Sequence, residues 1–155
     1  MPGYREQYHR MKRWYERFEA INQGHRHEVS SDYYLDEIYA FFENCYHLKD
    51  WIKNDSAVPV NDKKVVEGYI DGNRSLRLCA DICNALKHLE RTKRDRSHED
   101  PEFGKTHFAL NVGSGSLPIV SLKYEVDTNN GSEDAFNLAT DCVSAWNGFL
   151  SAHGL

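Results

Sequence analysis

The sequence contains no apolar run that approaches the length of a membrane-spanning helix. Its first residues also lack the apolar segment of a secretory signal peptide. Positive charge is not in excess, because the formal net charge is −5, and this argues against a protein that coats nucleic acid over its whole surface. We therefore expect a cytoplasmic protein that does not associate with a membrane.

Cysteine is scarce, with four among 155 residues. Each lies in a segment of helical periodicity, among apolar side chains, which is typical of buried free thiols in a reducing compartment rather than of a disulfide framework. Cys79 and Cys83 are four residues apart and His88 follows five later, but this is not the paired spacing of a structural zinc site. A zinc site is the weaker alternative to buried thiols, and we predict no metal and no cofactor. The four cysteines are Cys45, Cys79, Cys83 and Cys142.

The length and composition are those of an ordinary folded domain. Apolar residues make up 40% of the chain and charged residues 28%, which is typical of a globular rather than a disordered protein. No internal repeat, low-complexity tract or second domain is recognisable. We therefore predict one domain over residues 1–155.

Apolar residues recur at steps of three and four in four long segments, which is typical of amphipathic helices. A shorter helical turn is expected around residues 62–70. The sequence therefore predicts a mainly α fold, an antiparallel bundle of four long helices. The four segments cover residues 3–22, about 31–54, about 73–89 and about 132–152.

The pattern changes to strict alternation of apolar and polar residues before the last helix. Residues 107–112 and 120–127 alternate on either side of Gly113–Ser116, which predicts a two-stranded β-hairpin at about residues 105–127. An isolated hairpin is marginal in water, so it must pack on the helices. We expect residues 91–104 to form an exposed charged connection and Ser132 to cap the last helix.

Two of the predicted helices carry a line of polar residues at steps of three and four, which places each line on one helical face. If the two lines meet, they bring two imidazoles, two carboxylates, an amide and a guanidinium into one crevice. The alternative is that these residues are solvated and that Asp50 or Asp81 only pairs with Arg77, Lys49 or His88. The lines are Glu43, His47, Asp50 and Asn54 in the second helix, and Arg77, Asp81, Asn84 and His88 in the third.

The segment Cys83-Asn84-Ala85-Leu86-Lys87-His88 resembles the signature of the HEPN superfamily, small helical bundles of which many are metal-independent ribonucleases. That signature is an arginine, then a polar residue that is often Asn, then His. Here Cys83 stands in place of the arginine, and a thiol does not stabilise a phosphate as a guanidinium does. The segment Cys45–Trp51 also resembles small uncharacterised bacterial proteins.

The resemblance implies an RNA-binding protein or ribonuclease of a toxin or defence system, which works as a homodimer. RNA cleavage needs an acid and a base near neutral pKa, and histidine suits both. Asn84 would orient the phosphate or an imidazole, and a nearby cation would replace the missing arginine. The implied catalytic residues are His88, Asn84, His47 and Asp50, and the implied substrate-binding residues are Arg77, Lys87 and Arg91.

Two cationic segments could contact phosphate, although solvated charge is the alternative for both. One is a face of the first helix and the other follows the third helix. They consist of Arg5, Arg10, Lys12, Arg13 and Arg17, and of Lys87, Arg91, Lys93, Arg94 and Arg96.

Two other functions remain open. A non-catalytic protein-interaction module, such as an antitoxin, adaptor or regulator, would explain the missing arginine, the aromatic first helix and the open hairpin edges. A pocket for a small molecule, lined by Tyr46 and Trp51, is the third hypothesis.

Overall fold

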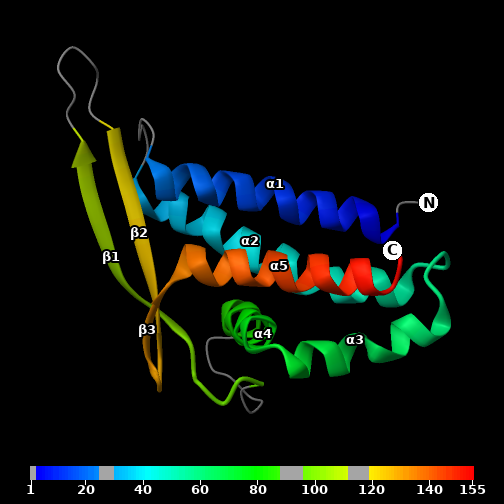
Figure 1. Ribbon diagram of the computed structural model, residues 1–155. Coiled ribbons are helices and arrows are strands. Elements are labelled where there is room, and N and C mark those ends of the chain that lie inside the picture. Colours follow the sequence, from blue (N-terminus) through cyan, green and yellow to red (C-terminus); the bar gives the residue numbers. More distant parts are fainter. Residues whose placement is uncertain (1–2, 25–29, 88–95, 112–118) are drawn as a thin grey trace.

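The computed structural model describes residues 3–24, 30–87, 96–111 and 119–155 (Figure 1). Within these residues the chain forms five helices and an antiparallel sheet of three strands. The expected mainly helical fold, with antiparallel strands before the last helix, is confirmed. The helices are α1 (Tyr4–Gln23), α2 (Ser31–Asn54), α3 (Val60–Gly72), α4 (Arg74–Lys87) and α5 (Ala135–Ala152), and the strands are β1 (Glu102–Asn111), β2 (Ile119–Thr128) and β3 (Gly131–Asp134).

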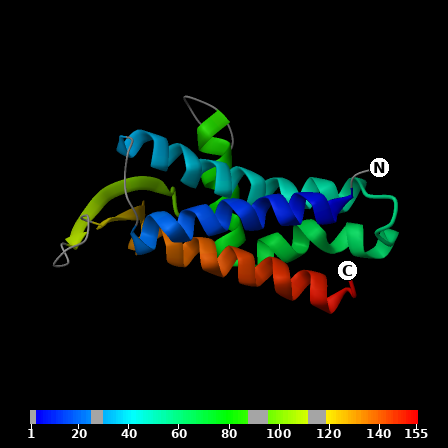
Figure 2. The same ribbon diagram turned by 90° about the horizontal axis from the view of Figure 1, so that it is seen from above.

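The helices α1, α2 and α5 lie side by side, and α4 runs across them (Figures 1 and 2), so the predicted antiparallel bundle of four long helices is matched only in part. The sheet stands at one end of this helical layer, and the two ends of the chain lie at the other end (Figure 1). None of the helices in the described ranges has the length and apolar character needed to cross a bilayer.

The core lies where α1, α2, α4 and α5 meet. It forms because α2 and α5 place apolar residues at steps of three and four, so that one side of each helix is continuously apolar. The largest fully buried side chains include Trp146, Phe18, Phe41, Phe42 and Phe149. These rings contact one another edge-to-face or tilted, as in the pairs Phe41–Phe42 and Trp146–Phe149.

Polar contacts fix α1 on α2. The buried amide of Gln7 donates to the backbone oxygen of Asn44 at 2.9 Å and to its side-chain oxygen at 3.1 Å. At the start of α1, the Tyr4 amide donates to Asp55 Oδ2 at 2.9 Å. A Cβ atom on Gly3 would lie 2.4 Å from that oxygen, so only glycine lets the carboxylate approach this closely.

The sheet packs one face on the helices. β1 and β2 are antiparallel, with Phe108 opposite Leu122, and the register shifts between Phe103 and Thr106. Leu122, Tyr124 and Val126 are buried, which confirms the apolar face predicted from the alternation. The Phe103 ring meets those of Tyr39 and Phe42 on α2 edge-to-face.

Two predicted segments are longer or more complex in the structure. Residues 60–72 form the 13-residue helix α3 rather than a short turn, because Val66 and Ile70 are buried four residues apart and stabilise more than one turn. The two hairpin strands cover residues 102–111 and 119–128, and the sheet has a third strand, β3, which pairs Val126 with Glu133.

The start of the last helix and the preceding charged connection also differ from the prediction. Ser132 lies in β3, and the cap is Asp134, whose Oδ1 accepts a hydrogen bond from the Asn137 amide at 2.9 Å. Residues 91–95 lie outside the described part. Ser97 and Glu99, however, are buried, because both are bound by side chains of α4 as described below.

Candidate functional site

The polar line of α2 lies on the side that faces away from the core. His47 follows the fully buried Cys45 by two residues, about 200° of rotation around the helix. Glu43, His47 and Asp50 are partly exposed and Asn54 is exposed. Lys49 Nζ donates to Asp50 at 2.7 Å, which is one of the local pairings expected if the line is solvated.

The polar line of α4 is divided between structural contacts and solvent. Arg77 donates to the backbone oxygen of Asp71, Asp81 is buried, and Asn84 is exposed. His88, Arg91 and the side chain of Lys87 lie outside the described part. The meeting of His47 and His88 in one crevice therefore stays a prediction.

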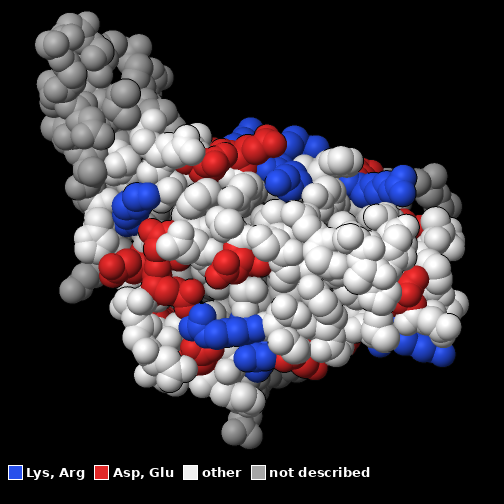
Figure 3. Space-filling view, in the orientation of Figure 1, with Lys and Arg blue, Asp and Glu red and all other residues white. Residues whose placement is uncertain are grey.

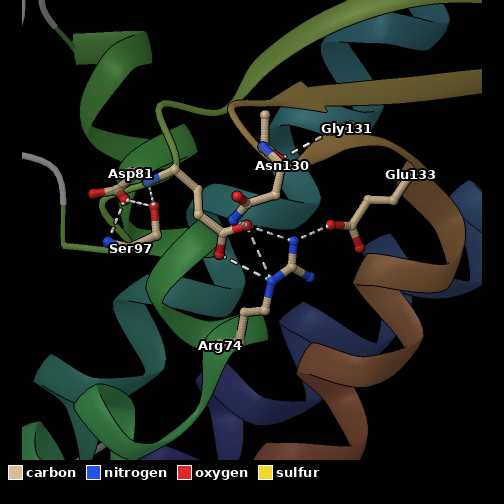
Figure 4. A network of polar contacts seen from close by, with 8 residues as sticks. Arg74, Asp81, Ser97, Asn130, Gly131 and Glu133 are labelled. Atoms are coloured by element: carbon tan, nitrogen blue, oxygen red, sulfur yellow. Dashed lines mark hydrogen bonds and ion pairs between the residues drawn. The ribbon is translucent and has the colours of Figure 1, made fainter.

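Asp81 binds the chain that follows α4. Its carboxylate accepts hydrogen bonds from the amides of Arg96 and Ser97, both at 2.7 Å, and from Ser97 Oγ at 2.5 Å (Figure 4). Neither Arg77 nor Lys49 is among these partners in the described part of the chain, and the third suggested partner, His88, lies outside it. The Asp81 carboxylate thus closes a loop after α4. The contact holds residues 96–97 against α4.

A second polar cluster lies beside Asp81, at the start of α4 (Figure 4). Arg74 donates three hydrogen bonds to Glu99, at 2.8, 2.9 and 3.2 Å, and one to Glu133 on β3, at 2.7 Å. Asn130 also donates to Glu99, at 3.0 Å. The side chain of Glu99 is 8% exposed and that of Arg74 is 46% exposed, so the cluster anchors a buried carboxylate and joins α4 to the sheet.

This cluster predicts a loss of stability in acid. Hydrogen bonds from Arg74 hold the pKa of Glu99 below its ordinary value. The stabilisation is therefore complete above the ordinary pKa of glutamate and is lost as the pH falls through the lowered value. We expect Glu99→Gln to cost about 1–3 kcal/mol at pH 7 and to flatten the acid dependence of the unfolding free energy, measured with urea. Glu16→Gln, at an exposed position of α1, is the control, and equal acid slopes for E99Q and the unsubstituted protein would contradict the assignment.

The outer side of α1 and α2 brings cations and aromatic rings together. The guanidinium carbon of Arg17 lies 4.7 Å from the ring centroid of Trp14, and that of Arg10 lies 5.5 Å from that of Trp51 on α2. Arg13, between the two arginines on α1, is exposed. His47 precedes Trp51 by one helical turn and so lies beside it. We call Arg10, Arg13, Trp14, Arg17, His47 and Trp51 the seam surface.

Carboxylates neutralise part of the seam surface. Glu6 binds Arg10 at 2.8 Å, and Glu37 lies 3.6 Å from Arg17. Figure 3 shows basic and acidic side chains intermixed along the upper edge of the molecule. Two members of the cationic face predicted on the first helix, Arg10 and Arg17, are therefore stacked on indole rings and paired with carboxylates, and the face is not a uniform positive patch.

Shallow cavities lie near the seam surface and the ends of the chain, and two of them contain residues of the predicted functional segments. One, of about 210 Å³, is lined by Asp50, Trp51, Asn54 and the neighbouring Gly3 and Asp55. A larger one, of about 410 Å³, lies between α1 and α5 and includes Arg5, Tyr8 and His9. Of the residues expected to line a pocket, Trp51, Asp50 and Asn54 line the smaller cavity. Tyr46 does not line it, and the centroid of its ring lies 4.8 Å from Lys49 Nζ.

Three cysteines that are distant in the sequence meet in the core. The sulfurs of Cys45, Cys79 and Cys142 lie within 4.8 Å of one another. Cys79 donates to the backbone oxygen of Phe42 at 3.4 Å, and Cys142 to that of Ser75 at 3.3 Å. Burial raises the pKa of both thiols. All four cysteines are buried, and none of them forms a disulfide, as the sequence predicted.

Nothing in the sequence predicts that Cys45, Cys79 and Cys142 lie close together. Residue spacing points to a different pair, Cys79 and Cys83, which lie four residues apart on one helix, yet Cys83 is not part of the cluster. The three sulfurs come from α2, α4 and α5, and their proximity depends on how three helices cross. Comparison with protein-family models, with curated proteins and with solved structures gave no match to this chain.

Proposed function

We propose that this protein binds single-stranded RNA through the seam surface on α1 and α2. The observation that carries the proposal is the pair of guanidinium–indole stacks, Arg17 with Trp14 and Arg10 with Trp51, beside the exposed Arg13. Proteins that bind single strands combine aromatic rings, on which bases stack, with cations that follow the phosphates. The seam surface offers both within two adjacent helices.

The position of His47 joins this surface to the HEPN-like residues. Because His47 lies one turn from Trp51, an RNA base stacked on the indole would bring its ribose and phosphate near the imidazole. In the ribonuclease version of the proposal, His47 and His88 are the acid and base and Asn84 orients the phosphate. Asp50 is the fourth residue of this catalytic set, and Arg77, Lys87 and Arg91 bind the substrate. Lys87 or Arg91 takes the place of the arginine that Cys83 replaces, and a homodimer completes the site.

Binding is tested by fluorescence anisotropy with a labelled single-stranded RNA of mixed sequence. We expect Trp14→Ala to weaken binding by about 1–3 kcal/mol, roughly 5- to 150-fold in Kd. Arg13→Gln should weaken binding and reduce the slope of log Kd against log salt by about 0.7. Arg5→Gln removes the same charge from α1 outside the seam surface and is the matched control. Equal effects of R13Q and R5Q, or no measurable binding, would contradict the proposal.

The ribonuclease version has its own test. Incubation of the RNA with the unsubstituted protein in the presence of a chelator should yield cleavage products, and His47→Ala and His88→Ala should abolish them. If the RNA binds but is not cleaved, the protein is an RNA-binding protein and the ribonuclease version is refuted.

A protein-interaction module is the second candidate, and the place of β1 favours it. The ten-residue strand β1 lies at the edge of the sheet, where a partner segment can add as a further strand. A tagged protein that recovers one stoichiometric partner from cells, and that binds no RNA, would favour this function over the first.

A further inference from the structure

The cluster of Cys45, Cys79 and Cys142 has the geometry of a three-coordinate thiolate site. Three bonds of about 2.3 Å from sulfur to a central atom place the sulfurs about 4.0 Å apart if the atom lies in their plane, and about 3.5 Å apart if it lies above that plane in a pyramid. The sulfurs here all lie within 4.8 Å of one another. Small side-chain rotations would therefore close them on a central ion, without movement of the helices.

The number of ligands narrows the choice of ion. No histidine, carboxylate or fourth thiol joins this group in the described part of the chain. Zinc is almost always held by four ligands in structural sites. Three sulfurs alone would leave its fourth coordination position unfilled, and the apolar core offers no ligand for it. An ion that is satisfied by three thiolates fits the cluster better.

The charge of the complex narrows the choice further. Three thiolates carry a charge of −3, which would leave −1 with a divalent ion and −2 with a monovalent one. Burying uncompensated charge is costly, and the buried charged residues in the described ranges, Asp81 and Glu99, are both acidic. A trivalent ion gives a neutral complex, which the core tolerates without a counter-ion.

We propose that Cys45, Cys79 and Cys142 form a binding site for one trivalent thiophilic metalloid, with arsenic(III) as its representative. Neutral arsenous acid reacts with three neutral thiols to give an arsenic trithiolate and three water molecules. Three As–O and three S–H bonds break, three As–S and three O–H bonds form, and arsenic stays trivalent. The reaction needs no oxidant and leaves no net charge.

Binding of arsenic to the three sulfurs would link three helices through one atom. Cys45 lies on α2, Cys79 on α4 and Cys142 on α5, so the complex acts as a cross-link between segments almost a hundred residues apart. Because a ligand that binds only the folded state stabilises it, we expect the melting temperature to rise with arsenite. The sulfurs are fully buried, so loading should be slow and should require local opening of the helices.

The test uses the full chain, reduced and incubated with sodium arsenite until the signal is constant. Native mass spectrometry should show one arsenic per chain. The increase in mass over the unbound protein should equal the mass of one arsenic atom less that of three hydrogen atoms. X-ray absorption at the arsenic edge should show three sulfur neighbours. Cys83→Ser, which changes the buried cysteine outside the cluster, should bind like the unsubstituted protein, whereas Cys45→Ser should lose binding or replace one sulfur neighbour by oxygen.

Several results would overturn the site. These are no bound arsenic, two sulfur neighbours in the unsubstituted protein, or loss of binding in C83S. Equal or tighter binding of Zn²⁺ or Cu(I) in competition would refute the charge argument. If C45S fails to fold by circular dichroism, the sulfur count in the unsubstituted protein still decides the question.

Discussion

Trp146→Ala should lower the unfolding free energy by about 3–5 kcal/mol, the usual cost of removing a buried tryptophan. Trp146 is fully buried and is the largest of the fully buried side chains in the described part of the chain. Its ring meets Phe149 edge-to-face with centroids 5.9 Å apart, and its Nε1 donates to the backbone oxygen of Cys45 at 3.1 Å. The substitution therefore removes packing and a link between α5 and α2.

Urea unfolding followed by circular dichroism measures this loss. Trp14→Ala is the matched control, because Trp14 is only partly buried and should cost much less. Trp146→Phe keeps an aromatic ring but not the donor, so its loss should fall between those of the two alanine variants. A loss below about 1 kcal/mol for W146A would show that α5 does not pack on α2 as described.

Asp81→Ala should have the second-largest effect and lower the unfolding free energy by about 2–4 kcal/mol. Its carboxylate accepts three hydrogen bonds from residues 96–97, and removal would leave the Ser97 amide and hydroxyl buried without this partner. Each unsatisfied buried group costs about 1–3 kcal/mol. Residues 96–99 should then detach from α4, which also weakens the contact between Arg74 and Glu99.

Asn84→Ala is the control for this prediction. Asn84 belongs to the same polar line of α4, three residues later, but it is exposed, so its substitution should change stability by less than about 0.5 kcal/mol. Similar effects of D81A and N84A in urea unfolding would contradict a structural role for Asp81.

The helices were the most predictable part of the fold. Residues 31–54 carry Ile38, Phe42, Cys45 and Leu48 at steps of three and four, and this spacing alone places the buried side of α2 correctly. Residues 60–72 have fewer apolar positions, so the extent of α3 could not be predicted from periodicity. Its two buried residues, Val66 and Ile70, depend on contacts with other helices.

Long-range polar contacts could not be predicted. The strand β3 has no apolar alternation, since its residues are Gly131-Ser132-Glu133-Asp134, and it forms because Val126 and Glu125 of β2 pair with it. Asp81 was recognised as one of a polar line, but its partners follow it by fifteen and sixteen residues across a charged segment. Nothing local in the sequence distinguishes such a carboxylate from a solvated one.

The candidate sites illustrate the same limit. The cationic face of the first helix was visible in the sequence, but the stacking of Arg10 on Trp51 joins residues on two helices. The thiols were predicted to be buried individually, whereas the cluster needs α2, α4 and α5 to meet at one depth. Residue spacing predicts which side of a helix is buried, and helix crossing decides which buried residues touch.

Photo-crosslinking tests the proposed RNA surface most directly. The protein is irradiated with a single-stranded RNA that contains 4-thiouridine, and the crosslinked peptides are identified by mass spectrometry. We expect crosslinks at residues 10–17 of α1 and 47–51 of α2, and their loss when unlabelled RNA competes. Crosslinks confined to α5 or to the strands, or none above those of an unrelated acidic protein, would contradict RNA binding at the seam surface.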